Sequence, residues 1–287
     1  MNGFPRLQSA PRLVPKRLPE SLRIGKYTAT PSQQSQTPQF EETFATIARS
    51  VIAIAVGTTN DGAPNIVGTG FALEFSEFFA TCWHVASYHD ELIKKSKSEL
   101  QNLGLMANKL RIALRSSDSY IWREIEAKTW LRGQNKEHDV CIYRIIGVAV
   151  PPLRLAQGNP LVLGAEVGLT GFPMGSLLQG DVIRPYVIKT NIAGGLEWPV
   201  SETAKSPRIA LGTAVARGFS GGPVFSVSDG AVVGMVASKM MEGDEDGSRW
   251  PSGISLAVMP DLLRQMLQTG VQQTTRTIKS AQASHLP

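Results

Sequence analysis

ARGFSGGPVF, residues 216–225, surrounds one serine, Ser220, with three glycines and a proline. Because glycine has no Cβ, the backbone can bend sharply there and another molecule can approach it closely. A serine in such a stretch is either a turn residue or a nucleophile. A serine hydroxyl is a weak nucleophile at neutral pH, so a nucleophilic Ser220 needs a base within hydrogen-bond reach and a group that orients the base.

The composition is that of a globular protein with many turns. The chain has 287 residues, of which 42% are hydrophobic and 18% are charged, with 27 glycines and 18 prolines. Frequent glycine and proline favour short strands over long helices. The most apolar segment, Ser50–Val56, has the length of a strand. It is far shorter than the roughly 20 residues of a membrane-spanning helix, so no membrane span is predicted.

The net charge of +5 comes from the first 39 residues. This segment holds six Lys or Arg residues and one Glu, whereas residues 40–287 carry equal numbers of acidic and basic side chains. The body therefore lacks the basic signature of a nucleic-acid-binding protein. Residues 1–39 are rich in Pro, Ser and Gln, which bury too little apolar area to fold, and are predicted to be a disordered basic leader. The alternative interpretation is that this leader binds an acidic partner or a membrane surface.

The cysteine content bears on the compartment. The chain has two cysteines, Cys82 and Cys141. A secreted protein of this kind usually carries more, paired in disulfides. We therefore predict a reducing, cytoplasmic setting, and the sequence leaves open whether Cys82 and Cys141 pair.

Residues from 40 onward are predicted to consist mainly of short strands. Hairpin signals at Asn60–Gly62 and Asp229–Gly230 separate β-rich runs. Further strand-like runs are KLRIALRSS, REIEAKTWL and HDVCIYRII in the first half, and EVGLTGF, RPYVIKTNI and RIALGTAV in the second. Ser87–Leu103 is predicted to be helical, because its apolar residues recur near a 3.6-residue period.

Many short strands in two similar halves indicate two β-barrels. We assign the first barrel to residues 40–150 and the second barrel, with a terminal helix, to residues 151–268. The proline-rich run at 148–160 is predicted to cross between them. The short helix is predicted to begin at Pro260, and residues 269–287 are predicted to be a loose polar tail.

The candidates for the base are the four histidines, His84, His89, His138 and His285. His84 ends the strand-like run FFATCWHV, and Asp139 opens the run DVCIY. The chain thus offers His84, Asp139 and Ser220 in that order, each at the edge of a predicted element. Strand ends of two barrels can converge, so we predict that these three side chains form a catalytic triad.

Several motifs occur in the order found in one family. TCWHV (81–85), HDVCIYRI (138–145) and GFSGGPVF (218–225) resemble the histidine, aspartate and serine motifs of chymotrypsin-like serine proteases. GTGF (68–71) is similar to the strand before the histidine in that family, and LTGFPMG (169–175) resembles a loop of its HtrA-type bacterial branch. The resemblance runs from about Ile47 to Leu263. It implies an all-β fold of two Greek-key β-barrels, with the active site in the cleft between them and a short C-terminal helix.

The resemblance also implies a serine endopeptidase that acts on protein or peptide substrates without a cofactor or a metal. Ser220 Oγ would attack the peptide carbonyl, His84 would take its proton and pass it to the leaving amine, and Asp139 would hold the imidazole in the required tautomer. The backbone N–H groups of Gly218 and Ser220 would form the oxyanion hole. One such donor is worth roughly 3–4 kcal/mol in the transition state.

The substrate pocket follows from the same resemblance. Ala214, six residues before the serine, would form the floor, and Ala237, Ser238 and Lys239 would line the wall. An uncharged floor predicts a small or medium apolar substrate side chain. If Lys239 points inward, an acidic side chain becomes the expected preference.

Two departures from the family bear on regulation. Phe219 stands where digestive relatives carry an aspartate that pairs with a new N-terminus, and there is no recognisable cleavable I-V-G-G start. We therefore predict that Ala214–Ser220 is a switch, ordered by substrate or by a regulatory protein partner. The 27 residues after Pro260 are too few for the PDZ domain usual in HtrA-type proteins, so no PDZ domain is expected.

Three alternatives stand beside the protease prediction. GFSGG also fits the nucleophile elbow of α/β-hydrolases, but that fold needs a helix after the serine and a later histidine, where only His285 occurs. A protease fold can also serve as a binding module with an idle triad. Cys82 lies two residues before His84, a spacing that some metal sites use, but a zinc site needs three or four ligands. His138, next to Asp139, leaves open which of the two residues matters.

Overall fold

The computed structural model describes residues 37–269, except 61, 93, 106–109, 117–118, 126–129, 146, 149, 159, 161, 174–182, 200–204 and 244–248. Residues 1–36 of the predicted leader (1–39) and residues 270–287 of the predicted tail (269–287) lie outside the described residues, whereas residues 37–39 and residue 269 are helical. Thr37–Pro287 forms one compact unit.

The first half of the compact unit is an antiparallel sheet with the strand order β5-β4-β1-β2-β3-β7-β6. The predicted hairpin at Asn60–Gly62 joins β1 and β2, where the N–H of Thr59 donates to the carbonyl of Ala63 at 2.8 Å. The strands of this sheet are β1 (Val51–Thr58), β2 (Pro64–Leu73), β3 (Phe75–Thr81), β4 (Leu110–Ser116), β5 (Ser119–Glu124), β6 (Trp130–Asn135) and β7 (Val140–Ile145).

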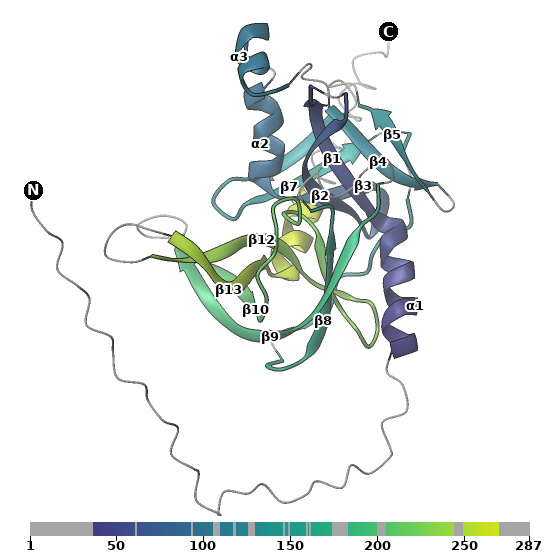
Figure 1. Cartoon of the computed structure of the whole chain (residues 1–287). Helices are drawn as coiled ribbons and strands as arrows, with labels where there is room; N and C mark the ends of the chain where they lie inside the picture. The colour runs from purple at the N-terminus through teal and green to yellow at the C-terminus, as the bar shows by residue number, and fades with distance from the viewer. Residues whose placement is uncertain are drawn as a thin grey trace, which may run out of the picture. The chain divides into compact units, whose positions relative to one another are not determined.

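The second half is a closed barrel with the strand order β10-β13-β12-β11-β8-β9, drawn in green shades in Figure 1. The predicted hairpin at Asp229–Gly230 joins two of its strands. The strands of the barrel are β8 (Glu166–Gly171), β9 (Tyr186–Pro199), β10 (Lys205–Leu211), β11 (Pro223–Ser226), β12 (Val232–Gly243) and β13 (Arg249–Val258). The all-β, two-barrel fold class is therefore confirmed, and the helix predicted from Pro260 is present at 260–269.

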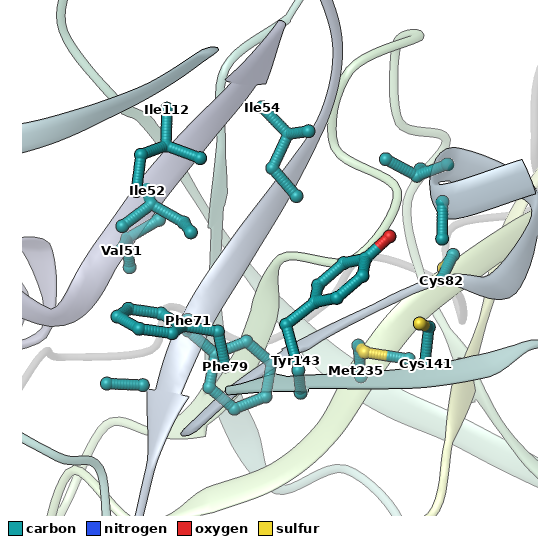
Figure 2. Packing of buried hydrophobic residues seen from close by; sticks show 14 of the residues in the cluster. Val51, Ile52, Ile54, Phe71, Phe79, Cys82, Ile112, Cys141, Tyr143 and Met235 are labelled. Atoms are coloured by element: carbon teal, nitrogen blue, oxygen red, sulfur yellow. The ribbon is translucent and has the colours of Figure 1, made fainter. Parts of the chain in front are cut away.

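Buried apolar side chains form two clusters, of which one lies within the barrel and the other spans both halves. One fills the interior of the closed barrel, with Leu169, Ile209 and Leu211 among its fully buried members. The other belongs to the first sheet but also takes in Met235 of β12, as the labelled side chains in Figure 2 show. Each fully buried Phe, such as Phe71, contributes about 2–3 kcal/mol relative to an exposed one. The shared cluster therefore packs the second barrel against the first sheet.

The segment 148–160 crosses between the halves, as predicted. Leu153 forms a parallel bridge with Leu73 of β2, and Leu155 forms one with Val232 of β12. Both leucines are buried. The crossing segment therefore pairs with the first sheet and then with the barrel.

The prediction of one helix at Ser87–Leu103 is wrong in its bounds. The structure has α2 at Trp83–Leu92 and α3 at Lys97–Asn102. The predicted strand end at His84 is also wrong, because the pairing of β3 with β7 stops at Thr81 and the helix begins two residues later. The break before α3 has a local cause, since Ser96 and Glu99 form a reciprocal capping box at its start.

The helix α1 (Thr37–Ile47) was not predicted. Its Phe40 ring stacks on Phe225 of β11 with ring centroids 6.3 Å apart, and its Thr43 hydroxyl donates to the carbonyl of Val227 at 3.3 Å. The helix therefore packs on the second barrel although it leads directly into the first sheet.

One predicted strand is divided. REIEAKTWL was expected to form a single strand, but β5 ends at Glu124 and β6 begins at Trp130. In the described part of the chain, no helix is long and apolar enough to cross a membrane.

Candidate active site

His84 is held by Asp139 through both its ring and its backbone. The ring Nδ1 lies 2.9 Å from Oδ2 and 3.0 Å from Oδ1 of Asp139, and the backbone N–H of His84 donates to Oδ1 at 3.0 Å. Because a carboxylate only accepts, Nδ1 carries a proton, and in the neutral imidazole Nε2 is therefore the nitrogen with the lone pair. The arrangement presents Nε2 as a base.

The start of α2 explains the backbone half of this contact. The first N–H groups of a helix have no partner within the helix, and a carboxylate is favoured there. Asp139 supplies that carboxylate from the turn before β7. The His84 side chain is 47% exposed and the Asp139 side chain 21%, so the imidazole faces solvent while the carboxylate lies beneath it.

Asp139 adopts an unusual backbone conformation. Its φ is +56°, the only positive value outside glycine among the described residues. Aspartate tolerates the left-handed region better than most residues, but at some cost in free energy. Its N–H donates to the carbonyl of Lys136 at 3.2 Å, which helps to fix the turn. In this conformation, the carboxylate of Asp139 reaches the backbone N–H of His84 at the start of α2.

Ser220 sits in a tight turn between β10 and β11. Gly218 has a φ of +97°, and a Cβ at that position would collide with the carbonyl of Phe172. The turn closes with the N–H of Gly222 donating to the carbonyl of Phe219 at 2.8 Å. Glycine is therefore required at Gly218 both by backbone conformation and by close packing. The turn leaves Ser220 partly exposed.

Thr69 of β2 holds this turn from the first sheet. Its hydroxyl donates to the carbonyl of Gly218 at 2.6 Å, and its N–H donates to the carbonyl of Ser220 at 2.9 Å. The hydroxyl also accepts the N–H of Phe172 at 3.0 Å. Thr69 is fully buried, so these bonds are shielded from water. The sequence analysis did not identify Thr69 as a functional residue. A threonine between two glycines in GTGF could have indicated a hydroxyl that contacts nearby backbone.

The segments that carry His84 and Ser220 meet at one carbonyl of β12. The oxygen of Val236 accepts the N–H of Gly221 at 2.7 Å and the thiol of Cys82 at 3.2 Å. Gly68 gives a second meeting point, because a Cβ there would lie 2.6 Å from Val85 and 3.1 Å from the carbonyl oxygen of Ser220. Cys82 and Val85, on either side of His84, and the backbone around Ser220 thus share two contact points, the carbonyl of Val236 and Gly68.

The predicted oxyanion donors are free within the described residues. Neither the N–H of Gly218 nor that of Ser220 donates a hydrogen bond there. Phe219, between them, is 2% exposed and belongs to the barrel core, so the site uses an apolar anchor where digestive relatives are expected to carry an aspartate. A buried ring fixes the peptide groups on either side of it.

The residues predicted to form a substrate pocket differ in exposure. Ala214 and Ser238 are exposed, whereas Ala237 is 3% exposed and packs in the shared core cluster. The side chain of Lys239 lies outside the described residues. The pocket assignment therefore stays a prediction.

The chemistry of Cys82 argues against a metal site. The nearest ligand atoms of Cys82, His84 and Asp139 lie within 4.8 Å of one another. Burial, and then the neighbouring Asp139 carboxylate, raise the pKa of the Cys82 thiol well above its ordinary value. Metals bind the thiolate, and Nδ1 of His84 is already occupied by Asp139. Cys82 and Cys141 are both buried, and no disulfide joins them in the described part of the chain.

A closed barrel packed on a sheet, with a histidine–aspartate pair on the sheet side and a glycine-bounded serine turn on the barrel side, is the arrangement of chymotrypsin-like proteins. The α/β-hydrolase alternative is excluded, because the residues after Ser220 form strand β11 and not a helix.

A family model described as the trypsin-like peptidase domain matches residues 68–235. This match covers more than half of the chain, and the chain therefore belongs to the trypsin-like peptidase family. No curated protein matches the chain at a significant level.

Solved structures with the same fold include HtrA-type proteases. The crystal structure of Deg5 is 18% identical over 81% of this chain and 93% of its own, with a TM-score of 0.55. The Rv3671c protease from M. tuberculosis in its active form is 18% identical over 82% of this chain and 86% of its own, with a TM-score of 0.54. The HtrA-type protease AlgW, a serine-to-alanine variant with a decapeptide, is 14% identical over 81% of this chain and 67% of its own, with a TM-score of 0.58. At these identities the similarity shows the fold alone.

Proposed function

We propose that the protein is a serine endopeptidase that cleaves peptide bonds through an acyl-enzyme. One observation carries the proposal: a single carboxylate fixes both the ring and the backbone of His84, which leaves Nε2 available as a base. The binding-module alternative has no comparable observation in its favour.

The proposed reaction begins with attack of Ser220 Oγ on the peptide carbonyl carbon, while its proton passes to Nε2 of His84. The developing oxyanion accepts hydrogen bonds from the N–H groups of Gly218 and Ser220. Collapse of this intermediate breaks the C–N bond, and the leaving amine takes the proton from His84. Water then hydrolyses the acyl-enzyme by the same route, with His84 again acting as the base.

We propose that substrates are proteins or peptides with a small or medium apolar side chain facing Ala214. The AlgW structure, which contains a decapeptide, supports a peptide ligand for this fold. An acidic preference remains the alternative, set by the orientation of Lys239. We propose a cytoplasmic setting, which the low count of two cysteines supports, because disulfides are rare there.

We also propose regulation at Ala214–Ser220 by substrate or by a protein partner. Thr69 already holds the carbonyls of Gly218 and Ser220. The exposed part of the segment is Ala214, Ala216 and Arg217. In the proposed switch, the residues that change conformation are therefore mainly those before Gly218. We propose that this regulation confines cleavage to few protein substrates.

The proposed function is tested by incubating the full chain with an unfolded protein such as casein and with a cell proteome, and mapping new termini by mass spectrometry. The matched control is Ser220→Ala, which removes only the side-chain oxygen. We expect cut sites with the wild type and about 10⁶-fold slower cleavage with the variant. Equal cleavage by both proteins, or none by the folded wild type, would reject the proposal.

A further inference from the structure

Arg208 is the only charged residue that is buried among the described residues, with 4% of its surface exposed. It lies on β10, where its neighbour Ile209 points into the barrel core. Because side chains alternate along a strand, Arg208 projects from the opposite face. Its Nη2 reaches the first sheet and donates to the carbonyl of His138 at 3.0 Å. A guanidinium from the second barrel thus lies directly behind the turn that carries Asp139.

A buried charge requires compensation. Burial lowers the pKa of Arg208, and the Asp139 carboxylate is the main influence in the opposite direction. Among the described residues, Arg208 forms no ion pair with any Asp or Glu, Asp139 included. Asp139 instead directs its oxygens to the two donors of His84. The guanidinium therefore acts on the carboxylate through space and does not compete for its oxygens.

The hydrogen bond to His138 fixes the peptide group that leads into Asp139. That residue has a φ of +56°, which is held by its surroundings and not by its own preference. The N–H of Asp139 also donates to the carbonyl of Lys136, at 3.2 Å, and helps to hold the same turn. Without Arg208, the His138 carbonyl would lose a buried donor and the turn could relax toward an ordinary conformation.

We propose that Arg208 is a positioning residue, which holds the His138–Asp139 turn and supplies a buried positive charge behind the carboxylate that orients His84. The inference rests on the proposed peptidase function. Arg208 lies in the second half of the chain and Asp139 in the first, so the residue also makes the histidine–aspartate pair depend on correct docking of the two halves.

The test compares Arg208→Lys, Arg208→Gln and Arg208→Met with the wild type, and uses Ser206→Ala as the matched control. Ser206 is buried two residues earlier on the same strand face, and its hydroxyl has no hydrogen-bond partner among the described residues. We expect Arg208→Met to lower kcat on the order of 10–100-fold with an unchanged KM, because the lost geometry affects the reacting groups and not substrate binding. Arg208→Gln keeps a donor without the charge, and Arg208→Lys keeps the charge and should recover part of kcat.

A second readout separates this proposal from the peptidase proposal. In the Ser220→Ala background, proton NMR records the low-field signal of the Nδ1–H that His84 donates to Asp139. We expect Arg208→Gln to shift or broaden this signal and Ser206→Ala to leave it unchanged. This result would support the positioning role even if the wild type cleaved nothing.

Two outcomes would overturn the proposal. One is a wild-type kcat and an unchanged low-field signal in Arg208→Gln and Arg208→Met. The other is failure of both uncharged variants to fold in thermal unfolding experiments, which would make the role of Arg208 structural only.

Discussion

At Asp139 one carboxylate accepts from two donors of the same residue, the ring and the backbone N–H of His84. The ring is thereby fixed in both orientation and tautomer. A neutral amide of the same size at this position could keep the backbone bond but could also donate to the ring. The charge of Asp139, and not its shape, is therefore the property that the proposed mechanism requires.

We expect Asp139→Asn to lower kcat by roughly 10⁴-fold, because an amide donor at Nδ1 favours the tautomer in which Nε2 carries the proton. Steady-state hydrolysis of a peptide substrate measures the effect, and circular dichroism controls for folding. A kcat within tenfold of the wild type would show that the carboxylate does not orient the base.

Cys82 makes the stability of the protein depend on pH. Burial raises the pKa of this thiol in the folded state, whereas the unfolded thiol titrates near 8.5. Above that pH the unfolded chain releases a proton that the folded chain keeps, so the free energy of unfolding falls as pH rises. We expect Cys82→Ala to flatten this fall between about pH 8.5 and 10, measured by urea unfolding at several pH values. An equally steep fall in the variant would contradict a protonated, buried thiol.

At the scale of elements, strand β2 organises the turn that carries Ser220. Thr69 bonds to the carbonyls of Gly218 and Ser220, on either side of the buried Phe219. These bonds orient the peptide groups next to the proposed oxyanion donors. A residue of the first sheet thus determines the geometry of a turn in the second barrel.

We expect Thr69→Val to lower the free energy of unfolding by about 1–3 kcal/mol, because it leaves the buried N–H of Phe172 and the carbonyl of Gly218 without partners. It should also lower kcat, since the turn is no longer held. Thr69→Ser keeps the hydroxyl and is the matched control. Denaturant unfolding and peptide hydrolysis measure both effects, and a valine variant as stable and active as the serine variant would contradict the role of the hydroxyl.

The sequence predicted most strands because their hydrophobic runs and hairpin turns are local signals. It missed α1, although Phe40, Phe44 and Ile47 are spaced as on one helix face, and it placed the start of α2 too late because no capping residue precedes Trp83. Thr69 and Arg208 were also missed. Their roles arise from contacts between residues that are far apart in the sequence, and no local pattern shows such contacts.

At the scale of the whole molecule, the proposed site belongs to neither half alone. His84 on α2 and Asp139 in the turn before β7 come from the first half, and Ser220 in the turn between β10 and β11 comes from the second half. The segments that carry His84 and Ser220 meet at the carbonyl of Val236, which accepts hydrogen bonds from the N–H of Gly221 and the thiol of Cys82. The shared apolar cluster packs the halves against each other (Figure 2). The proposed site therefore requires the two halves to be docked against each other.

The most direct measurement is labelling of the folded full chain with a fluorophosphonate, followed by mapping of the adduct by mass spectrometry. The reagent modifies a serine only where a neighbouring base activates it. We predict one adduct on Ser220, its loss in Ser220→Ala, and much slower labelling in His84→Ala. A folded wild-type protein that remains unlabelled, or that labels equally fast without His84, would contradict the account.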